Sequence, residues 1–420
     1  MAVATPTVLH LSLVVGGELR DAGGERLGRV DDLIVRLGDD DYPPVAGVVA
    51  TVAGRQVFVA AEQIVELGPG FVTLIGDQLD LQRFRRRPQE VLLKKDVLDR
   101  QLINVDGARL VRANEIELAR LEGWYRVVGV DVSLRGLVRR VIPRSLAGRI
   151  DAGGFLDWAS VEPFTGHVPT VRLRVPHPKL AKLHPAQVAD LVEAASHNEG
   201  EEIMAAVAAD PEREADVFEE LEDSHQLEFV EDRSDEEIAE LLGRMETDDA
   251  ADLVLQLPEE RREDVIGLLS SFQARRLRTL LGFDPATAGG LMSPEFVCVY
   301  ADATREEALE RVERSSLPAE ALSWVYGMNT HRRLRGGIAL ADLVRTAEGE
   351  RLWNVLRPVQ TVRPDADLEE VARLMTDFDL TVVAVVDEEE RVLGIVTVDD
   401  VLELVLPEPW RRRFGLLGSD

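Results

Sequence analysis

Short runs of alternating apolar and polar residues occupy the chain from residue 8 to residue 82, and glycine-containing turns separate them. Three of these runs are "LGRVDDLIVRL", "VAGVVATV" and "RQVFVAAEQIVEL". A period of two predicts β-strands, and helical periodicity is nearly absent here. The pattern returns after a basic segment at residues 83–88, in "WYRVVGVDVS" and "TVRLRV". We therefore predict two small β-domains built on a duplicated pattern, at residues 1–90 and 91–176.

The period of the apolar residues changes from two to 3.6 after the proline-rich segment "VPHPKLAKLHP" at residues 175–185. Seven amphipathic helices are predicted up to about residue 284: "PAQVADLVEAA", "GEEIMAAVAA", "READVFEEL", "DEEIAELLGRM", "DDAADLVLQL", "REDVIGLLSS" and "ARRLRTLLGF". The segment "LHPAQVADLVEAA" realigns with "METDDAADLVLQL". Repeated helix pairs bury their apolar faces on one another. We expect a helical domain at residues 177–284 with a strongly acidic outer surface.

A second duplication fills most of the remaining sequence. "VYADATREEALERV" realigns with "VRPDADLEEVARLM", and "LRGGIALADLV" realigns with "VLGIVTVDDVL". Each copy predicts the order strand, helix, strand, turn, strand, helix. We expect two α/β units at residues 285–356 and 357–406, followed by a basic tail at 407–420.

Charge and composition narrow the function classes. The formal charge of −29 argues against nucleic-acid binding, which depends on clustered Lys and Arg, and favours cations as ligands. The single cysteine, Cys298, cannot form an internal disulfide, which favours a reducing cytoplasm. The apolar runs are far shorter than the roughly 20 residues that cross a bilayer, so no transmembrane segment is predicted. Acidic pairs lack a His, Ser or Cys partner in any catalytic order, so no enzyme is predicted.

Three aspartates lie in the predicted helix that follows "MET": Asp248, Asp249 and Asp252. Thr247 is a suitable N-cap, and the helix dipole favours each first-turn carboxylate by roughly 0.3–1 kcal/mol. Asp252 shares a helical face with the other two, and like charges at this spacing repel unless a cation intervenes. A solvated acidic surface explains this pattern, and so does a Mg²⁺ site, since Mg²⁺ prefers a few hard carboxylate oxygens and keeps several waters.

From about residue 180 to residue 406 the sequence resembles the cytosolic part of the MgtE magnesium transporter family. The resemblance is carried by "LHPAQVADLVE", "METDDAADLVLQLPEERRE", the joint "FDPATAGGLMSPEF" and residues 366–405. The two β-domains resemble the PRC-barrel family through "GERLGRVDDLIV" and "WASVEPF". The resemblances imply a multidomain α+β protein with two PRC-barrel-like domains, a superhelical MgtE N-type domain and a tandem CBS α/β pair.

The MgtE resemblance implies that Mg²⁺ ions bridge the helical domain to the CBS pair. Asp248, Asp249 and Asp252 match the acidic helix that faces the CBS domains in the family. Further candidate ion ligands by position are Asp367, Asp379, Asp400 and Glu403. Where the family continues into a carboxylate-rich connecting helix and a membrane domain, this sequence has "PEPWRRRFGLLGSD" and ends. Ion sites that depend on that helix are therefore not expected.

CBS domains of this kind also hold adenine nucleotides, ATP or AMP. In the family, a Thr three residues before an Asp contacts phosphate while the carboxylate contacts ribose, and Thr397 and Asp400 fit this spacing. An ordinary helix N-cap explains the same residues equally well. The first copy has Ala339 in place of the hydroxyl, so at most one nucleotide site is expected. "TAGG" at residues 287–290 lacks the Lys and Ser/Thr of a P-loop and predicts a flexible elbow.

These observations lead to one expected function and two alternatives. We expect a soluble Mg²⁺ sensor and scaffold, cytoplasmic or peripheral at the membrane, whose helical domain closes on the CBS pair when Mg²⁺ binds. By family analogy it forms a homodimer through the CBS pair and regulates a separate membrane magnesium transporter or other client protein. The alternatives are an adenine-nucleotide-responsive CBS module and an inert assembly adaptor.

Overall fold

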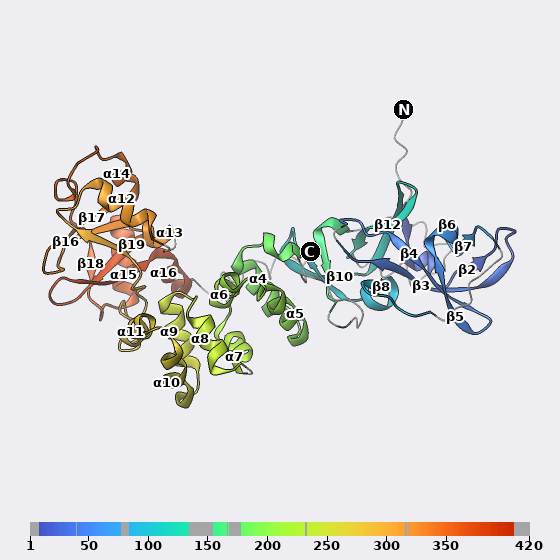
Figure 1. Cartoon of the computed structure of the whole chain (residues 1–420), viewed down its shortest axis with the longest axis horizontal. Coiled ribbons are helices and arrows are strands. Elements are labelled where there is room, and N and C mark those ends of the chain that lie inside the picture. Colours follow the sequence, from blue (N-terminus) through green and yellow to red (C-terminus); the bar gives the residue numbers. More distant parts are fainter. Residues whose placement is uncertain are drawn as a thin grey trace. The chain divides into compact units, whose positions relative to one another are not determined.

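The structure is a computed structural model that describes residues 8–38, 40–76, 84–133, 154–165, 167, 178–231, 233–315, 317 and 319–406, apart from the side chains of Glu320 and Glu403. Its backbone forms two compact units, Met1–Asp210 and Pro211–Asp420. The first unit is rich in strands, and the second combines helices with two small sheets (Figure 1).

Three sheets make up most of the described part of the first unit. The largest has the strand order β5-β4-β3-β2-β7-β6, with β8 also paired to β3. The second has the order β1-β11-β12-β13, and the third has the order β10-β9-β14. The strands are β1 (Leu9–His10), β2 (Glu18–Arg20), β3 (Arg26–Arg36), β4 (Val45–Val52), β5 (Arg55–Ala60), β6 (Ile64–Gly68), β7 (Phe71–Leu74), β8 (Glu90–Leu92), β9 (Gln101–Asn104), β10 (Arg109–Arg112), β11 (Glu115–Leu121), β12 (Trp124–Asp131), β13 (Phe155–Asp157) and β14 (Val161–Pro163).

Among the described residues of the first unit, the helical segments are mostly short. They are α1 (Leu11–Val14), η1 (Ala61–Gln63), η2 (Leu93–Val97), η3 (Trp158–Ser160), η4 (Pro178–Lys182), α4 (Pro185–Ala194) and α5 (His197–Val207). Within the described residues, the two predicted β-regions are therefore confirmed as β-structure. The predicted strand "TVRLRV" at residues 170–175 and the predicted basic tail at residues 407–420 lie outside the described residues. The two β-regions share one hydrophobic core, which contains Leu19 and Val72 from the first region and Ile116 and Trp158 from the second. Strand β1 also pairs with β11, with Leu9 opposite Leu118.

The basic segment between the two β-regions is used inside the fold. An ion pair of 3.0 Å joins Arg86 to Asp96, and both side chains are largely buried. The guanidinium of Arg87 lies 4.8 Å from the centre of the Phe58 ring and 3.9 Å from a carboxylate oxygen of Glu90. These contacts account for two of the arginines as packing and pairing residues, because a stacked and paired guanidinium is already satisfied.

Six helices open the second unit: α6 (Pro211–Glu219), α7 (Asp223–Glu231), α8 (Asp235–Leu242), α9 (Thr247–Gln256), α10 (Glu259–Leu268) and α11 (Ser271–Leu280). Local signals explain several boundaries. Ser234 caps α8 in a capping box with Glu237, which satisfies backbone amides at the helix start. Helix α9 buries Ala250, Leu253 and Val254. The seven predicted helices are confirmed, and α7 is a further helix that the apolar pattern did not predict.

Two small sheets follow, with the same topology. Each has a parallel first pair and an antiparallel second pair of strands. The first sheet contains β15 (Val297–Tyr300), β16 (Trp324–Met328) and β17 (Leu334–Ala339), with α12 (Arg305–Glu313), α13 (Ala319–Leu322), α14 (Leu340–Arg345) and η5 (Leu352–Asn354). The second contains β18 (Thr361–Val362), β19 (Val382–Val386) and β20 (Val392–Thr397), with α15 (Leu368–Phe378) and α16 (Val398–Val405). The predicted duplication is confirmed.

The joint between the helices and the sheets is packed, so the predicted flexible elbow is wrong. The amides of Ala288 and Gly289 donate to the carbonyls of Ala366 and Pro364, both at 2.8 Å. Further along, Ser293 and Ile395 exchange two backbone hydrogen bonds of 2.8 and 2.9 Å. These bonds attach the joint to the second α/β unit because they satisfy backbone groups that would otherwise require water.

Candidate functional site

A half-buried aspartate with one fully buried carboxylate oxygen lies in the first turn of α9. The Oδ1 atom of Asp248 is buried and accepts no hydrogen bond from the described residues. Burial, followed by the negative charges of Asp400, Glu246 and Glu295, raises the pKa of Asp248 well above its ordinary value. A buried acceptor without a partner is costly, so this position calls for a proton or a cation.

Asp400, at the start of α16, carries the charge that acts most strongly on Asp248. Its Oδ2 atom accepts a hydrogen bond of 2.9 Å from the backbone amide of Thr397, and the Thr397 hydroxyl accepts from the Asp400 amide at 3.5 Å. Burial raises the pKa of Asp400, although the hydrogen bonds from Thr397 oppose the shift. Thr397 is buried and acts as the N-cap of α16. The structure therefore accounts for both residues by helix capping.

A third carboxylate of this group was not predicted from the sequence. Glu295 follows the joint, and its Oε1 atom accepts a hydrogen bond of 3.2 Å from the Thr247 hydroxyl. The same oxygen lies 3.1 Å from a guanidinium nitrogen of Arg276 in α11. The predicted N-cap is wrong by one residue, because Thr247 is the first residue of α9 and Glu246 precedes it as N-cap. The Thr247 hydroxyl donates to the carboxylate of Glu295 and does not cap α9.

A second residue that was not predicted is Glu219, at the end of α6. Its Oε1 atom accepts a hydrogen bond of 2.6 Å from the amide of Glu246. Burial, and then the charges of Glu246 and Asp216, raise the pKa of Glu219 to about 8. The available signal is a run of acids at a helix C-terminus, where the helix dipole disfavours negative charge.

The other predicted ligands divide by position. Asp249 is half-buried in the first turn of α9. Asp252 is an exposed residue, and partial loss of water around its carboxylate, together with the charge of Asp223, raises its pKa to about 6. Glu403 belongs to α16, and its side chain lies outside the described part of the chain.

Asp367 and Asp379 lie at the two ends of α15. Asp367 is the exposed N-cap and accepts a hydrogen bond of 2.8 Å from the Glu370 amide. Asp379 is the exposed C-cap in the left-handed conformation, with φ of 52°. Among the described interactions, neither carboxylate contacts Asp248 or Asp400. Both positions are explained by helix capping.

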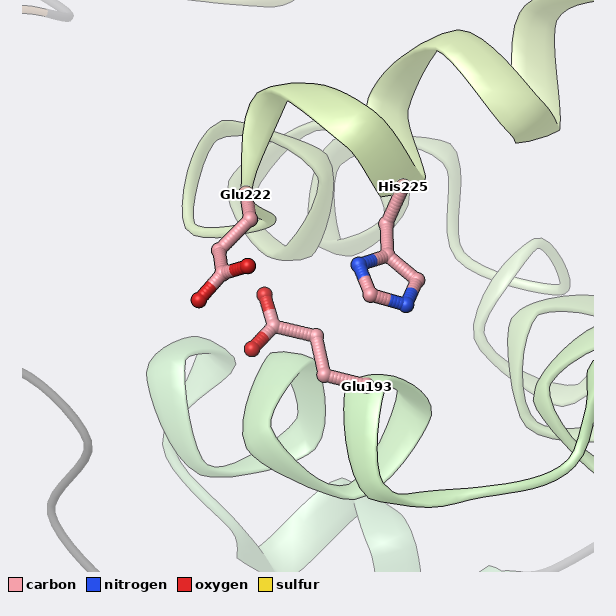
Figure 2. Close-up of side chains that lie close together, drawn as sticks. All are labelled: Glu193, Glu222 and His225. Carbon is pink, nitrogen blue, oxygen red and sulfur yellow. The ribbon is translucent and has the colours of Figure 1, made fainter.

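Helix α7, which was not predicted, begins next to a glutamate and carries a histidine. Glu222 and His225 of the second unit are drawn in Figure 2, where Glu222 precedes α7 and His225 lies in its first turn. Glu193, which is also drawn, belongs to α4 in the first unit, and we assign it no role with the other two.

The charges of Asp400 and Glu295 act on Asp248, and all three side chains offer oxygen ligands. Such ligands suit a hard divalent cation, and Mg²⁺ in particular binds through one or two carboxylates while keeping several waters. The unpartnered Oδ1 atom of Asp248 is the observation that fits such an ion. Among the described helices, none combines the length and the apolar character that a membrane span requires.

Comparison with known proteins identifies the second half of the chain. The family described as "MgtE intracellular N domain" matches residues 183–286, and the family described as "CBS domain" matches residues 354–407. The magnesium transporter MgtE of Thermus thermophilus is 40% identical over 164 residues, which are 37% of this chain and 36% of that protein. The magnesium transporter MgtE of Bacillus subtilis is 27% identical over 209 residues, which are 49% of this chain and 46% of that protein.

Solved structures extend this similarity to the three-dimensional level. A crystal structure of the cytosolic domain of the Mg²⁺ channel MgtE in complex with ATP has a TM-score of 0.50 and 33% identity, covering 54% of this chain and 92% of that one. The soluble part of a magnesium transporter has a TM-score of 0.50 and 27% identity, covering 54% and 89%. The chain spans between about a third and about half of the length of the curated relatives. Through its MgtE N domain and its CBS region, the chain therefore belongs to the family of MgtE cytosolic domains.

Proposed function

We propose that this protein is a Mg²⁺-sensing regulatory protein of the MgtE type, in which Mg²⁺ draws the acidic helices against the CBS pair. The observation that carries the proposal is the buried, unpartnered Oδ1 atom of Asp248, on which the charges of Asp400 and Glu295 act. The relatives from Thermus thermophilus and Bacillus subtilis are magnesium transporters, which supports Mg²⁺ as the ligand.

Electrostatic repulsion supplies the response. Residues 211–420 contain 48 Asp and Glu residues against 23 Lys and Arg residues. Asp248 and Asp400 hold like charges at the ends of two helices, and each charge disfavours close approach of the other. A divalent ion bound to both carboxylates reverses this preference. Because the ion binds the closed arrangement more tightly than the open one, its concentration sets the two populations.

The other candidate residues act as additional Mg²⁺ ligands in this proposal. Asp249 and Asp252 lie on the same helix as Asp248, and Glu403 lies on the same helix as Asp400. Asp367 and Asp379 are peripheral ligands, because both are exposed at the ends of α15. The same proposal includes two PRC-barrel-like domains that bind a client, at residues 1–90 and 91–176. It also includes a helical domain at 177–284, two CBS domains at 285–356 and 357–406, and a basic tail at 407–420. A cytoplasmic location, a homodimer formed through the CBS pair, a membrane magnesium transporter as client, and the absence of enzyme activity are further parts of it.

A magnesium titration of the full chain tests the proposal. We expect the radius of gyration from small-angle scattering to fall between EDTA and millimolar Mg²⁺. We also expect the melting temperature to rise, because a ligand at 100 times its dissociation constant adds about 2.7 kcal/mol, or roughly 5–10 °C for a region of this size. In the Asp248→Asn variant both changes are expected to disappear. An unchanged radius and melting temperature in the wild-type chain would overturn the proposal.

A second candidate function is a response to adenine nucleotides. The similar MgtE cytosolic structure contains ATP. Thr397 and Asp400 have the spacing expected for phosphate and ribose contacts, although they cap α16 in this chain. Calorimetry with ATP and with AMP separates the two functions. Nucleotide binding in a chain whose radius does not respond to Mg²⁺ would favour the nucleotide function over the magnesium sensor.

A further inference from the structure

One arginine lies among the carboxylates that surround the start of α9. Arg276 of α11 forms an ion pair of 3.1 Å with Glu295, and the two side chains are only 22% and 20% exposed. The guanidinium also lies 5.2 Å from the centre of the Phe272 ring. Contacts on two sides hold Arg276 in one orientation, so the ion pair is better fixed than a pair on the open surface.

Glu295 is itself tied to the second α/β unit. Two backbone hydrogen bonds join Ser293 to Ile395 of β20, and the amide of Glu295 donates to the Ser293 hydroxyl at 3.3 Å. On the other side, the Thr247 hydroxyl of α9 donates to the Glu295 carboxylate at 3.2 Å. Glu295 therefore connects two helices of the helical region, α9 and α11, to a strand of the second α/β unit.

We infer that Arg276, Glu295 and Thr247 form a latch that holds the helical region against the second α/β unit without any metal ion. The positive charge of Arg276 offsets part of the repulsion that Asp400 and Glu295 exert on Asp248. Only one consequence of the latch rests on the proposed function, namely its effect on Mg²⁺ sensing. If part of the population is already closed, less Mg²⁺ is needed to close the rest.

Limited proteolysis and small-angle scattering of the full chain in EDTA test the latch. In Arg276→Gln, we expect cleavage within residues 281–296 to be at least about 3-fold faster than in the wild-type chain, with a larger radius of gyration. The matched control is Arg278→Gln, which breaks the exposed pair of Arg278 with Glu263 at 3.0 Å on the same helix. The control is expected to behave like the wild-type chain. Arg276→Lys keeps the charge and is expected to stay close to wild type.

Equal cleavage rates and radii for Arg276→Gln and the wild-type chain in EDTA would overturn the latch. Loss of closure in Arg276→Lys to the same extent as in Arg276→Gln would also overturn it, because the effect would then come from packing on Phe272 and not from the ion pair. Circular dichroism confirms that each variant is folded. If Mg²⁺ does not change the radius of gyration of the wild-type chain, the proposed function is contradicted. The latch is then tested independently by the cleavage rates and radii measured in EDTA.

Discussion

Burial of the Asp248 carboxylate at the start of α9, and then the charge of Asp400 at the start of α16, raise the pKa of Asp248. The two residues are 152 positions apart in the sequence. When both carboxylates are charged they repel each other, and this repulsion acts between the helical region and the second α/β unit. A proton and a divalent cation both relieve it, which makes the relationship measurable in two independent ways.

Neutralising Asp248 should stabilise the chain when no metal ion is present. A raised folded-state pKa means that the stability contribution is fully present below the ordinary value of 3.8 and is lost as pH rises through the folded-state pKa. In EDTA at pH 7.5, Asp248→Asn should therefore unfold at a higher temperature than the wild-type chain. Below pH 4 the difference should vanish. Differential scanning calorimetry across this pH range measures it.

The control for Asp248→Asn is Asp379→Asn. Asp379 is exposed and adopts the left-handed conformation, which Asn tolerates well. We expect the melting temperature of Asp379→Asn to match the wild-type value at every pH. If both variants shift alike, a general reduction of negative charge explains the stabilisation, and the special position of Asp248 is wrong.

Glu219 should make the second unit less stable at alkaline pH. Its pKa rises from 4.5 to about 8 because of burial and the nearby charge of Glu246, so its contribution is lost as pH rises from 4.5 through about 8. Glu219→Gln keeps an oxygen that accepts from the Glu246 amide. It should raise the free energy of unfolding at pH 8 by at least about 1 kcal/mol, or roughly 2–4 °C, and have little effect at pH 4.5. Glu220→Gln, at an exposed neighbouring position, should show no such pH dependence.

Two substitutions of Thr397 separate helix capping from nucleotide binding. Asn is a good N-cap, so Thr397→Asn should keep the melting temperature within about 2 °C of wild type. Thr397→Val removes the cap of α16 and should cost about 1 kcal/mol. If nucleotides bind at this site, both variants should lose ATP binding in calorimetry, including the one that remains stable. Retention of ATP binding by Thr397→Asn would show that the hydroxyl serves the helix and not a nucleotide.

The packed joint should be sensitive to a methyl group at Gly394. A Cβ atom there would lie 2.6 Å from the carbonyl oxygen of Ser293, which takes part in the backbone pairing with Ile395. Gly394→Ala should therefore destabilise the second unit by about 1–3 kcal/mol in urea unfolding. Gly267→Ala, in α10 with open space around it, should instead stabilise by about 0.5–1 kcal/mol. If Gly394→Ala leaves the free energy of unfolding unchanged, the backbone pairing of Ser293 with Ile395 adjusts to the added methyl group and the joint is not tightly packed.

The sequence by itself determined the order and kind of the elements. Periods of two and 3.6 are local properties of the chain, and they identified the β-regions, seven of the helices between residues 177 and 284, and the duplicated α/β units. Helix α7 escaped because "DSHQLEFVE" has little apolar periodicity. The resemblance to the MgtE family also came from contiguous segments. The sequence alone also placed three aspartates at helix starts. Asp248 and Asp249 follow "MET", and Asp400 follows "GIVT".

Only the tertiary structure decided which carboxylates lie together. The charges of Asp400 and Glu295 act on Asp248, whereas Asp367 and Asp379 cap α15 in solvent. It also decided that Thr247 donates to Glu295 and that the joint is fixed on Ile395. The physical reason is that repulsion and desolvation depend on distances and on the exclusion of water between segments far apart in the chain. Periodicity fixes which face of a helix is polar, but it does not fix what that face meets.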